Sequence, residues 1–104
     1  MQSNTIMKFE TGDHIYVGGT SLQGQIEIGY NQLVRILGDP TYEASSDGKV
    51  LAEWYLKFED GTVATIYDWK NYGRKVEYIT DWHIGGFNET AVELVKEVLG
   101  NAVR

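Results

Sequence analysis

The strongest pattern of apolar and polar positions spans residues 49–70 and predicts a β-hairpin. In its first half, apolar residues alternate with charged residues and tyrosine, as in a strand with one buried face; the apolar positions are Ala52, Trp54, Leu56 and Phe58. A two-residue loop at 60–61 would place Trp54 opposite a tyrosine. A three-residue loop at 59–61, with Gly61 left-handed, places Trp54 opposite Ile66 and Leu56 opposite Ala64. We predict the three-residue loop, because it pairs apolar residues with apolar residues.

The predicted register also defines the second face of this hairpin. It places four residues of the return strand beside Tyr55 and Lys57, namely Val63, Thr65, Tyr67 and Trp69. This face therefore carries aromatic and hydroxyl groups on a rigid surface. We expect it to lie under a helix, against another subunit or around a ligand.

Two other segments have the period of an amphipathic helix. The first is predicted to end at Gly38, before Pro40, and its apolar positions are Tyr30, Leu33, Val34 and Leu37. The second is predicted to be capped by Asn88 and to end at Gly100, with apolar positions Ala91, Leu94, Val95 and Val98.

The remaining segments complete a small α+β domain. Alternation and glycine positions predict further strands at 14–19, 24–28 and 78–84, with Gly85-Gly86 ending the last one; the predicted connections are 20–24, 41–48 and 71–74. The predicted order is β-β-α-β-β-β-α, with both helices packed on a mainly antiparallel sheet.

Composition and charge narrow the classes of function. The chain has 104 residues, 42% of them hydrophobic, and no cysteine, so we expect one globular domain over 1–104 without disulfides or thiolate ligands. Fifteen acidic against nine basic residues give a net charge of −6, which argues against binding to duplex nucleic acid. No apolar run is long enough to span a membrane, and the N-terminal residues lack the apolar segment of a signal peptide. We therefore expect a cytoplasmic protein.

The residues give little support for catalysis or for a metal site. His14 and His83 lie outside any metal-binding spacing, and a third ligand would have to come from an aspartate elsewhere. Thr20 and Ser21 lack the sequence context of an activated nucleophile. Their segment, TSLQG, is predicted to be a tight loop: either a plain turn or a loop whose backbone amides approach an anion.

Residues 67–86 combine aromatic rings, cations and a Gly-Gly pair unusually densely. The aromatic residues include Tyr67, Trp69, Tyr72 and Trp82, and the cations are Lys70, Arg74 and Lys75. Aromatic faces suit the stacking of nucleobases, and cations with free backbone amides suit phosphates. The alternative is that Trp69 and Trp82 are core residues and that the cations are solvated. Composition favours neither interpretation.

Four strings in order resemble a known family, namely TSLQG, GYNQLVRILGDPT, AEWYLKFEDGTVATIYDWK and DWHIGG. They resemble a widespread family of small bacteriophage proteins over residues 19–99, with 1–18 as an N-terminal extension peculiar to this chain. We associate that family with phage sponges, which sequester cyclic dinucleotides such as cyclic GMP-AMP and so silence CBASS antiphage defence. The resemblance implies tight binding of the intact nucleotide in the host cytoplasm, with no catalysis, cofactor or metal.

The resemblance also implies which residues bind the ligand, because two purines need stacking surfaces and two phosphodiesters need anion contacts. The matching strings supply Thr20, Ser21, Gln23, Gly24, Tyr67, Trp69, Lys70, Trp82, His83, Gly85 and Gly86. A ligand with two-fold symmetry further implies a homo-oligomer, with the pocket at or near the subunit interface.

Two other functions compete with this hypothesis. The same aromatic face would suit an inhibitor that binds a host protein, since Trp and Tyr dominate interface hot spots. A cyclic-nucleotide phosphodiesterase ranks third, because the sequence offers no set of metal ligands.

Overall fold

The structure is a computed structural model that describes residues 7–104. It has six strands, β1 (Phe9–Thr11), β2 (Ser21–Glu27), β3 (Tyr42–Glu43), β4 (Ala52–Phe58), β5 (Val63–Tyr67) and β6 (Asp81–Gly86). The helices are α1 (Tyr30–Leu37) and α2 (Thr90–Leu99), with short 3₁₀ turns η1 (Val76–Tyr78) and η2 (Gly100–Ala102). All strand pairs are antiparallel, in the order β1-β4-β5-β6-β2, with β3 also paired to β4. The predicted α+β class and element order are confirmed, with β3 as an addition.

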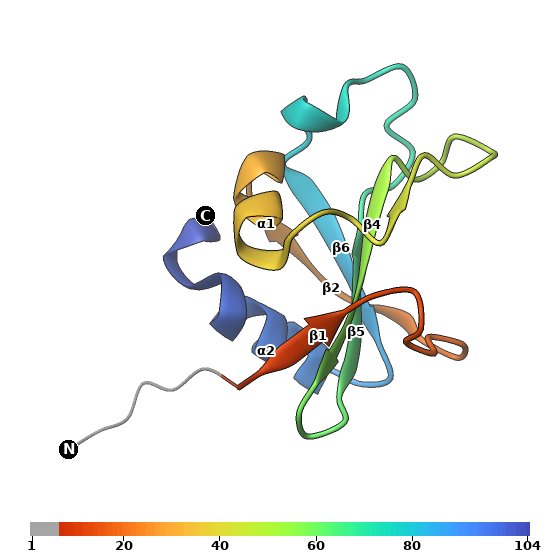
Figure 1. The fold of residues 1–104 in the computed structure, drawn as a ribbon. Coiled ribbons are helices and arrows are strands. Elements are labelled where there is room, and N and C mark those ends of the chain that lie inside the picture. Colours follow the sequence, from red (N-terminus) through yellow and green to blue (C-terminus); the bar gives the residue numbers. More distant parts are fainter. Residues whose placement is uncertain (1–6) are drawn as a thin grey trace.

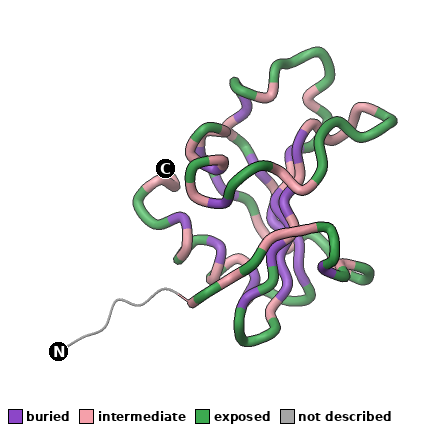
Figure 2. Tube along the Cα trace, in the orientation of Figure 1, coloured by how far each residue is buried: buried purple, intermediate pink, exposed green. Residues whose placement is uncertain are grey.

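Both helices lie on the same side of the sheet (Figure 1). We call the face beneath them the covered face and the opposite one the open face. Side chains of the covered face and of the helices form one core, shown as the buried segments in Figure 2. Its largest fully buried members are Trp54, Trp82, Phe58, Ile28 and Leu33. The apolar stripes of the helices and the alternation of β4 therefore meet in a single layer.

The β4–β5 hairpin has the predicted register. Trp54 is opposite Ile66 and Leu56 is opposite Ala64, so the apolar residues of both strands share the covered face. The turn is closed by the Phe58 amide, which donates to the Thr62 carbonyl at 2.8 Å. Gly61 has φ of +93°, a conformation that side chains disfavour. The three-residue loop is thus confirmed.

The two helices also end where the sequence predicts. Gly38 and Gly100 follow them with φ of +89° and +57°, and each glycine amide donates back to a carbonyl of its helix. At the start of α2, the Asn88 carboxamide oxygen accepts a hydrogen bond from the Thr90 amide at 2.9 Å. Local signals were sufficient here because a helix terminus is decided within a few residues.

The first predicted strand is wrong in position. The sheet begins at β1, in part of the supposed N-terminal extension, while residues 14–19 belong to the connection between β1 and β2. Because β1 and β2 lie at opposite edges of the sheet, this connection must cross it. Figure 1 shows it on the side away from the helices. Ile15 is buried in this crossing segment, which therefore shields part of the open face.

Three further predictions are corrected. TSLQG is not a loop, because Ser21 onward belongs to β2 with a bulge between Leu22 and Gly24. The last strand begins at Asp81 rather than 78, and Gly85-Gly86 lies inside β6 instead of ending it. The connection 41–48 contains β3, which pairs with β4 at Tyr42 and Glu43. Each error concerns strand pairing, which depends on distant partners.

In residues 7–104, neither helix has the length and apolar character needed to cross a membrane.

Candidate functional site

A row of polar and aromatic side chains crosses the open face from strand to strand. Glu53 is opposite Tyr67, Tyr67 is opposite His83, and His83 is opposite Gln25. The rings of Tyr67 and His83 meet edge to face, with centroids 5.4 Å apart. Glu53, Tyr67 and His83 are each partly exposed. The structure thus brings two predicted site residues, Tyr67 and His83, into direct contact on an accessible surface.

Burial and charge act together on this row. Desolvation by burial raises the pKa of the Glu53 carboxyl, and the nearby Asp68 carboxylate raises it further. The pKa of Tyr67 is raised by desolvation and by Glu53. Both groups are therefore held toward their protonated forms by their surroundings.

The second row of the open face is packed more tightly. Thr65 is opposite Gly85, and both are buried although neither faces the helices. A Cβ on Gly85 would stand 2.5 Å from the Thr65 hydroxyl oxygen and 3.6 Å from a Tyr67 ring carbon. Gly85 therefore lets the Thr65 and Tyr67 side chains lie over β6. Its role in this fold is close packing within a strand, not the anion-binding turn that the sequence suggested.

Gly24 and Gly86 lie on the covered face, where they allow close packing against α2. A Cβ at Gly24 would contact Val92 at 3.0 Å, and one at Gly86 would stand 2.5 Å from the Cβ of Ala91. Both neighbours belong to α2, so these glycines let the helix approach the sheet. Because they lie beneath a helix, the structure does not place them in a surface ligand site.

Trp82 is a core residue, contrary to its predicted role in stacking on a ligand. It has no exposed surface, and its ring meets Trp54 edge to face at 5.5 Å. Its indole N–H donates to the Ile28 carbonyl at 3.0 Å. The alternation of Trp82 with Asp81 and His83 was the signal for this placement, since Trp82 shares its face with Ile84.

Trp69 lies on the surface, where we define the lysine–tryptophan corner as Lys49, Trp69 and Lys70. The Trp69 side chain is 44% exposed. The ammonium groups of Lys49 and Lys70 lie 5.8 and 5.6 Å from the centroid of its ring. These distances are close to the outer limit of a cation–π contact, about 6 Å. The corner thus offers an accessible aromatic face beside two positive charges.

The corner is held by the buried carboxylate of Asp68. One carboxylate oxygen accepts hydrogen bonds from the amides of Leu51 and Ala52 at 2.7 and 3.0 Å. The other accepts one from the Asn71 side chain at 3.1 Å. The Lys70 amide donates to the Lys49 carbonyl at 2.7 Å, with Lys70 at φ of +57°. Asp68 therefore fixes the two segments that carry the lysines, a role that the sequence analysis missed.

Thr20, Ser21 and Gln23 form a separate group. The Thr20 hydroxyl donates to the Val17 carbonyl at 2.8 Å, and the Gln23 amide donates to the Ser21 hydroxyl and the Gly86 carbonyl. Ser21 shares a row across the sheet with Gly86 and Ala64. Trp69 lies five residues after Ala64, so it is five positions away from this row. That is roughly 15 Å at strand spacing. The surface residues of the predicted site therefore divide into two groups: Trp69, Lys70, Tyr67 and His83 lie toward one end of the sheet, and Thr20, Ser21 and Gln23 lie toward the other.

Three polar side chains on the open face and at the corner have no hydrogen-bond partner among the described residues. Within residues 7–104, the structure gives no hydrogen bond to the Tyr67 hydroxyl, the His83 ring nitrogens or the Trp69 indole. The indole N–H groups of Trp54 and Trp82, in contrast, both donate to backbone carbonyls at 3.0 Å. Donors and acceptors on the open face are thus free to bind a ligand.

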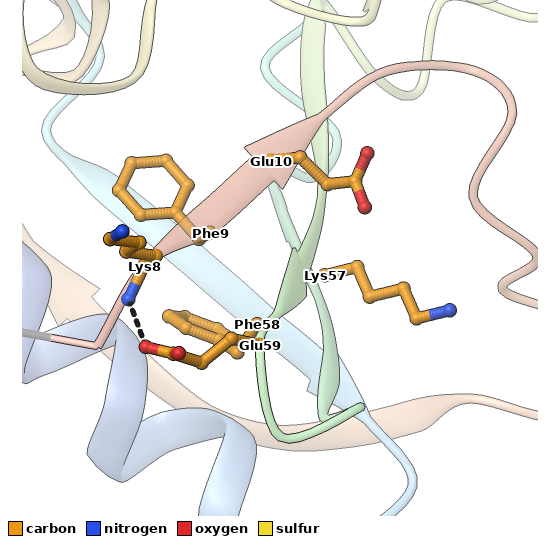
Figure 3. Close-up of a pocket in the computed structure, with 6 residues that line it drawn as sticks. All are labelled: Lys8, Phe9, Glu10, Lys57, Phe58 and Glu59. Atoms are coloured by element: carbon orange, nitrogen blue, oxygen red, sulfur yellow. Dashed lines mark hydrogen bonds between the residues drawn. The ribbon is translucent and has the colours of Figure 1, made fainter.

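The recess between β1 and β4 is a weaker candidate. It has a volume of about 230 Å³ and is lined by Lys8, Phe9, Glu10, Lys57, Phe58 and Glu59. Figure 3 shows Glu10 and Lys57 pointing away from the Phe9 and Phe58 rings, while the Lys8 amide donates to Glu59. The charged groups do not converge on one point, so this gap at the sheet edge lacks the geometry of a binding site.

The histidines do not assemble a metal centre. His14 lies 2.8 Å from the Glu10 carboxylate, on the exposed surface. Among the residues from Met7 to Arg104, no group of three His, Asp or Glu side chains is placed to hold a metal ion.

Comparison with models of protein families, with curated proteins and with solved structures finds no match to this chain.

Proposed function

We propose that this protein binds a cyclic dinucleotide of the cyclic GMP-AMP type and sequesters it without hydrolysis. The observation that carries the proposal is the lysine–tryptophan corner, an exposed indole with two ammonium groups within 6 Å of its ring, on a backbone fixed by Asp68. An indole stacks on a purine, and the ammonium groups attract phosphodiester oxygens. In a phage-infected cell, such a protein would remove the signal for CBASS defence from the host cytoplasm.

The local charge supports an anionic ligand despite the overall charge of −6. Lys49 and Lys70 lie at the corner, with Lys49 also 4.0 Å from the Asp47 carboxylate. The Arg74 guanidinium is 3.4 Å from the Asn71 side chain, which is itself bonded to Asp68. A small anion responds to this local potential more than to distant surface carboxylates, which solvent screens. Tyr67, the last residue of β5, and His83, its partner on β6, carry free polar groups that add contacts for a base or ribose.

A second copy of the chain would complete the site for a two-fold ligand. Each corner has one exposed indole, whereas a cyclic dinucleotide has two bases. Two chains related by a two-fold axis would present two equivalent indoles to it. We therefore propose a homo-oligomer as the binding-competent form.

Calorimetry with a panel of cyclic di- and trinucleotides, in buffer containing EDTA, tests the proposal. We expect saturable binding with a sub-micromolar dissociation constant for at least one purine-containing ligand. Heating the complex and separating the released ligand by chromatography should return it intact. Linear product would instead identify a phosphodiesterase, and no binding across the panel would refute the proposal.

A matched pair of variants locates the binding. Trp69→Ala removes one base–aromatic contact, which is expected to weaken binding by roughly ten- to a hundredfold. Phe87→Ala removes a comparably exposed ring beyond the end of β6, away from the corner. We expect its affinity to equal that of the wild-type protein.

One observation favours inhibition of a host protein as the second candidate. Several large apolar side chains are exposed, namely Tyr16, Leu22, Tyr42, Tyr72, Tyr78 and Phe87. Tyr16 projects from the segment that crosses the open face and is 80% exposed. Aromatic residues of this kind anchor protein interfaces. Retention of a host protein on the immobilised chain, lost in Tyr16→Ala but not in Trp69→Ala, would favour this candidate.

A further inference from the structure

We propose that a second site on the open face, the recess formed by Tyr42, Glu53 and Tyr55, binds an organic cation. The ligand chemistry is an alkylammonium or guanidinium head group, either on a free small molecule or on a lysine or arginine side chain of a partner. This site uses none of the residues of the lysine–tryptophan corner. Tyr67 neighbours both sites, but Glu53 and Tyr55 belong only to this one, so variants at these two positions test it independently of nucleotide binding.

Three tyrosines surround the carboxylate of Glu53. Tyr42 of β3 and Tyr67 of β5 are its direct cross-strand neighbours, and Tyr55 is the next residue on the same face of β4. Direct neighbours in a sheet have Cβ atoms about 5 Å apart. The Tyr42 and Tyr55 rings stand at 64° to each other with centroids 5.3 Å apart, so they form two walls of an aromatic corner. Aromatic walls around an anion are the arrangement that recognises ammonium groups.

Glu53 has no counter-ion among residues 7–104. Among the described residues, its carboxylate makes neither a hydrogen bond nor a salt bridge, although the residue is only partly exposed. Burial of a carboxylate without a partner opposes folding. A bound cation would supply the missing partner and offset that cost.

The recess has room for such a head group and a rigid rim. Its volume is about 290 Å³, and its lining also includes Glu43, Ala44, Ser45 and Val50. Ala44 has φ of +46°, a strained conformation for alanine. Two backbone hydrogen bonds hold this segment against the start of β4, from the Ala44 amide to Leu51 at 2.9 Å and from the Ser45 amide to Val50 at 2.7 Å. The rim is thus fixed before any ligand binds.

The decisive experiment compares a cation with its uncharged isostere. Choline and 3,3-dimethylbutan-1-ol have nearly the same shape, but only choline carries a positive charge. In an NMR titration of the full chain, choline should shift the amide signals of Tyr42, Glu53 and Tyr55 in a saturable manner. We expect the alcohol to bind at least tenfold more weakly. Equal binding of the two compounds, or no shift at these residues, would overturn the proposal.

Variants separate the charge from the aromatic walls. Glu53→Gln should weaken choline binding at least tenfold, and Tyr55→Leu by roughly three- to thirtyfold, the range of a cation–π contact. Glu59→Gln changes an exposed carboxylate in the turn after β4, away from the recess, and should leave binding unchanged. If Glu59→Gln weakened choline binding as much as Glu53→Gln does, the binding would depend only on the net charge of the protein. That result would contradict a specific site at Glu53.

The source of the cation is distinguished by a second titration. N-acetyl-arginine methylamide represents a free ligand, and a longer arginine-containing peptide represents a partner protein. Tighter binding of the peptide than of the amide would support a partner's side chain as the occupant, and equal binding would support a free cation. If neither compound shifts the Glu53 signals, the guanidinium part of the proposal is wrong.

Discussion

On the covered face, Trp54 and Trp82 meet edge to face at 5.5 Å, and each indole N–H donates to a backbone carbonyl at 3.0 Å. On the open face, Tyr67 and His83 meet in the same way at 5.4 Å, but within residues 7–104 their polar atoms have no hydrogen-bond partner. The two aromatic contacts have similar geometry, but the polar groups of the two pairs differ in whether they are hydrogen-bonded. A core satisfies its polar groups internally, whereas a surface that binds a ligand leaves them free.

The largest expected effect is the loss of an aromatic residue from the covered face. Trp82→Ala would remove a fully buried ring and leave a cavity next to Trp54. We expect a loss of about 3–5 kcal/mol in the free energy of unfolding, measured by denaturant titration. The loss is a large part of the total for a domain of this size, about 5–15 kcal/mol. A loss of stability smaller than that caused by replacing an exposed aromatic residue with alanine would contradict the assignment of Trp82 to the core.

A smaller loss is expected at the turn that sets the register of both faces. Gly61→Val places a β-branched side chain at φ of +93°. This should lower the free energy of unfolding by about 1–2 kcal/mol. Nothing lies within 4 Å of the added Cβ, so the effect would come from the backbone alone. Equal stability of the two proteins would refute the left-handed assignment of Gly61.

Trp69→Ala should have little effect on stability. Its ring is 44% exposed and contacts flexible lysine side chains, so we expect a loss of less than about 1 kcal/mol. Paired measurement of melting temperature and ligand affinity checks this directly. If Trp69→Ala destabilised the protein more than Trp82→Ala, with ligand affinity unchanged in the folded fraction, the assignment of Trp69 to the surface and of Trp82 to the core would be wrong.

Glu53→Gln is expected to stabilise the protein slightly at neutral pH. Desolvation, followed by the charge of Asp68, raises the pKa of Glu53 above its value in the unfolded chain. Between the two values the folded state binds more protons, so its stability falls as pH rises through this window. The variant removes that cost. Its stability should exceed that of the wild-type protein above the folded pKa, and the difference should shrink as pH falls toward about 4.3, the ordinary pKa of a glutamate.

Thermal unfolding of both proteins across this pH range provides the measurement. The lowered pKa values of the exposed Asp47 and Asp60 carboxylates act in the opposite direction, but they are common to both proteins and cancel in the comparison. A variant less stable than the wild-type protein at neutral pH would mean that Glu53 supports the fold, and would remove the reason to assign it a ligand.

The sequence was informative wherever structure depends on near neighbours. The hairpin register was predicted from the choice of turn at Gly61, and the end of each helix was predicted from the glycine that follows it, Gly38 or Gly100. The placement of Trp82 was left open because composition alone does not separate a core residue from a stacking one. Its alternation with His83 along the strand places the two side chains on opposite faces. The predicted register already placed Tyr55 on the face of Tyr67, and the same alternation adds Glu53 to that face.

Other features could not be obtained from the sequence. Tyr42 becomes a neighbour of Glu53 only because β3 pairs with β4. Gly24 and Gly86 lie beneath α2, and their need for close packing is set by Val92 and Ala91 on a different element. The buried Asp68 connects the two ends of the hairpin, because it bonds the amides of Leu51 and Ala52, which precede it by 17 and 16 residues. All these depend on contacts between residues distant in the chain, which local patterns do not encode.

An NMR titration of the isotope-labelled protein with cyclic GMP-AMP tests most directly whether the open face is the binding surface. We predict saturable shifts at the amides of Lys49, Trp69 and Lys70, extending to Tyr67 and His83, with little change in α1 and α2. Shifts concentrated on the helices, or the absence of shifts with cyclic GMP-AMP and with every other purine cyclic dinucleotide, would contradict it.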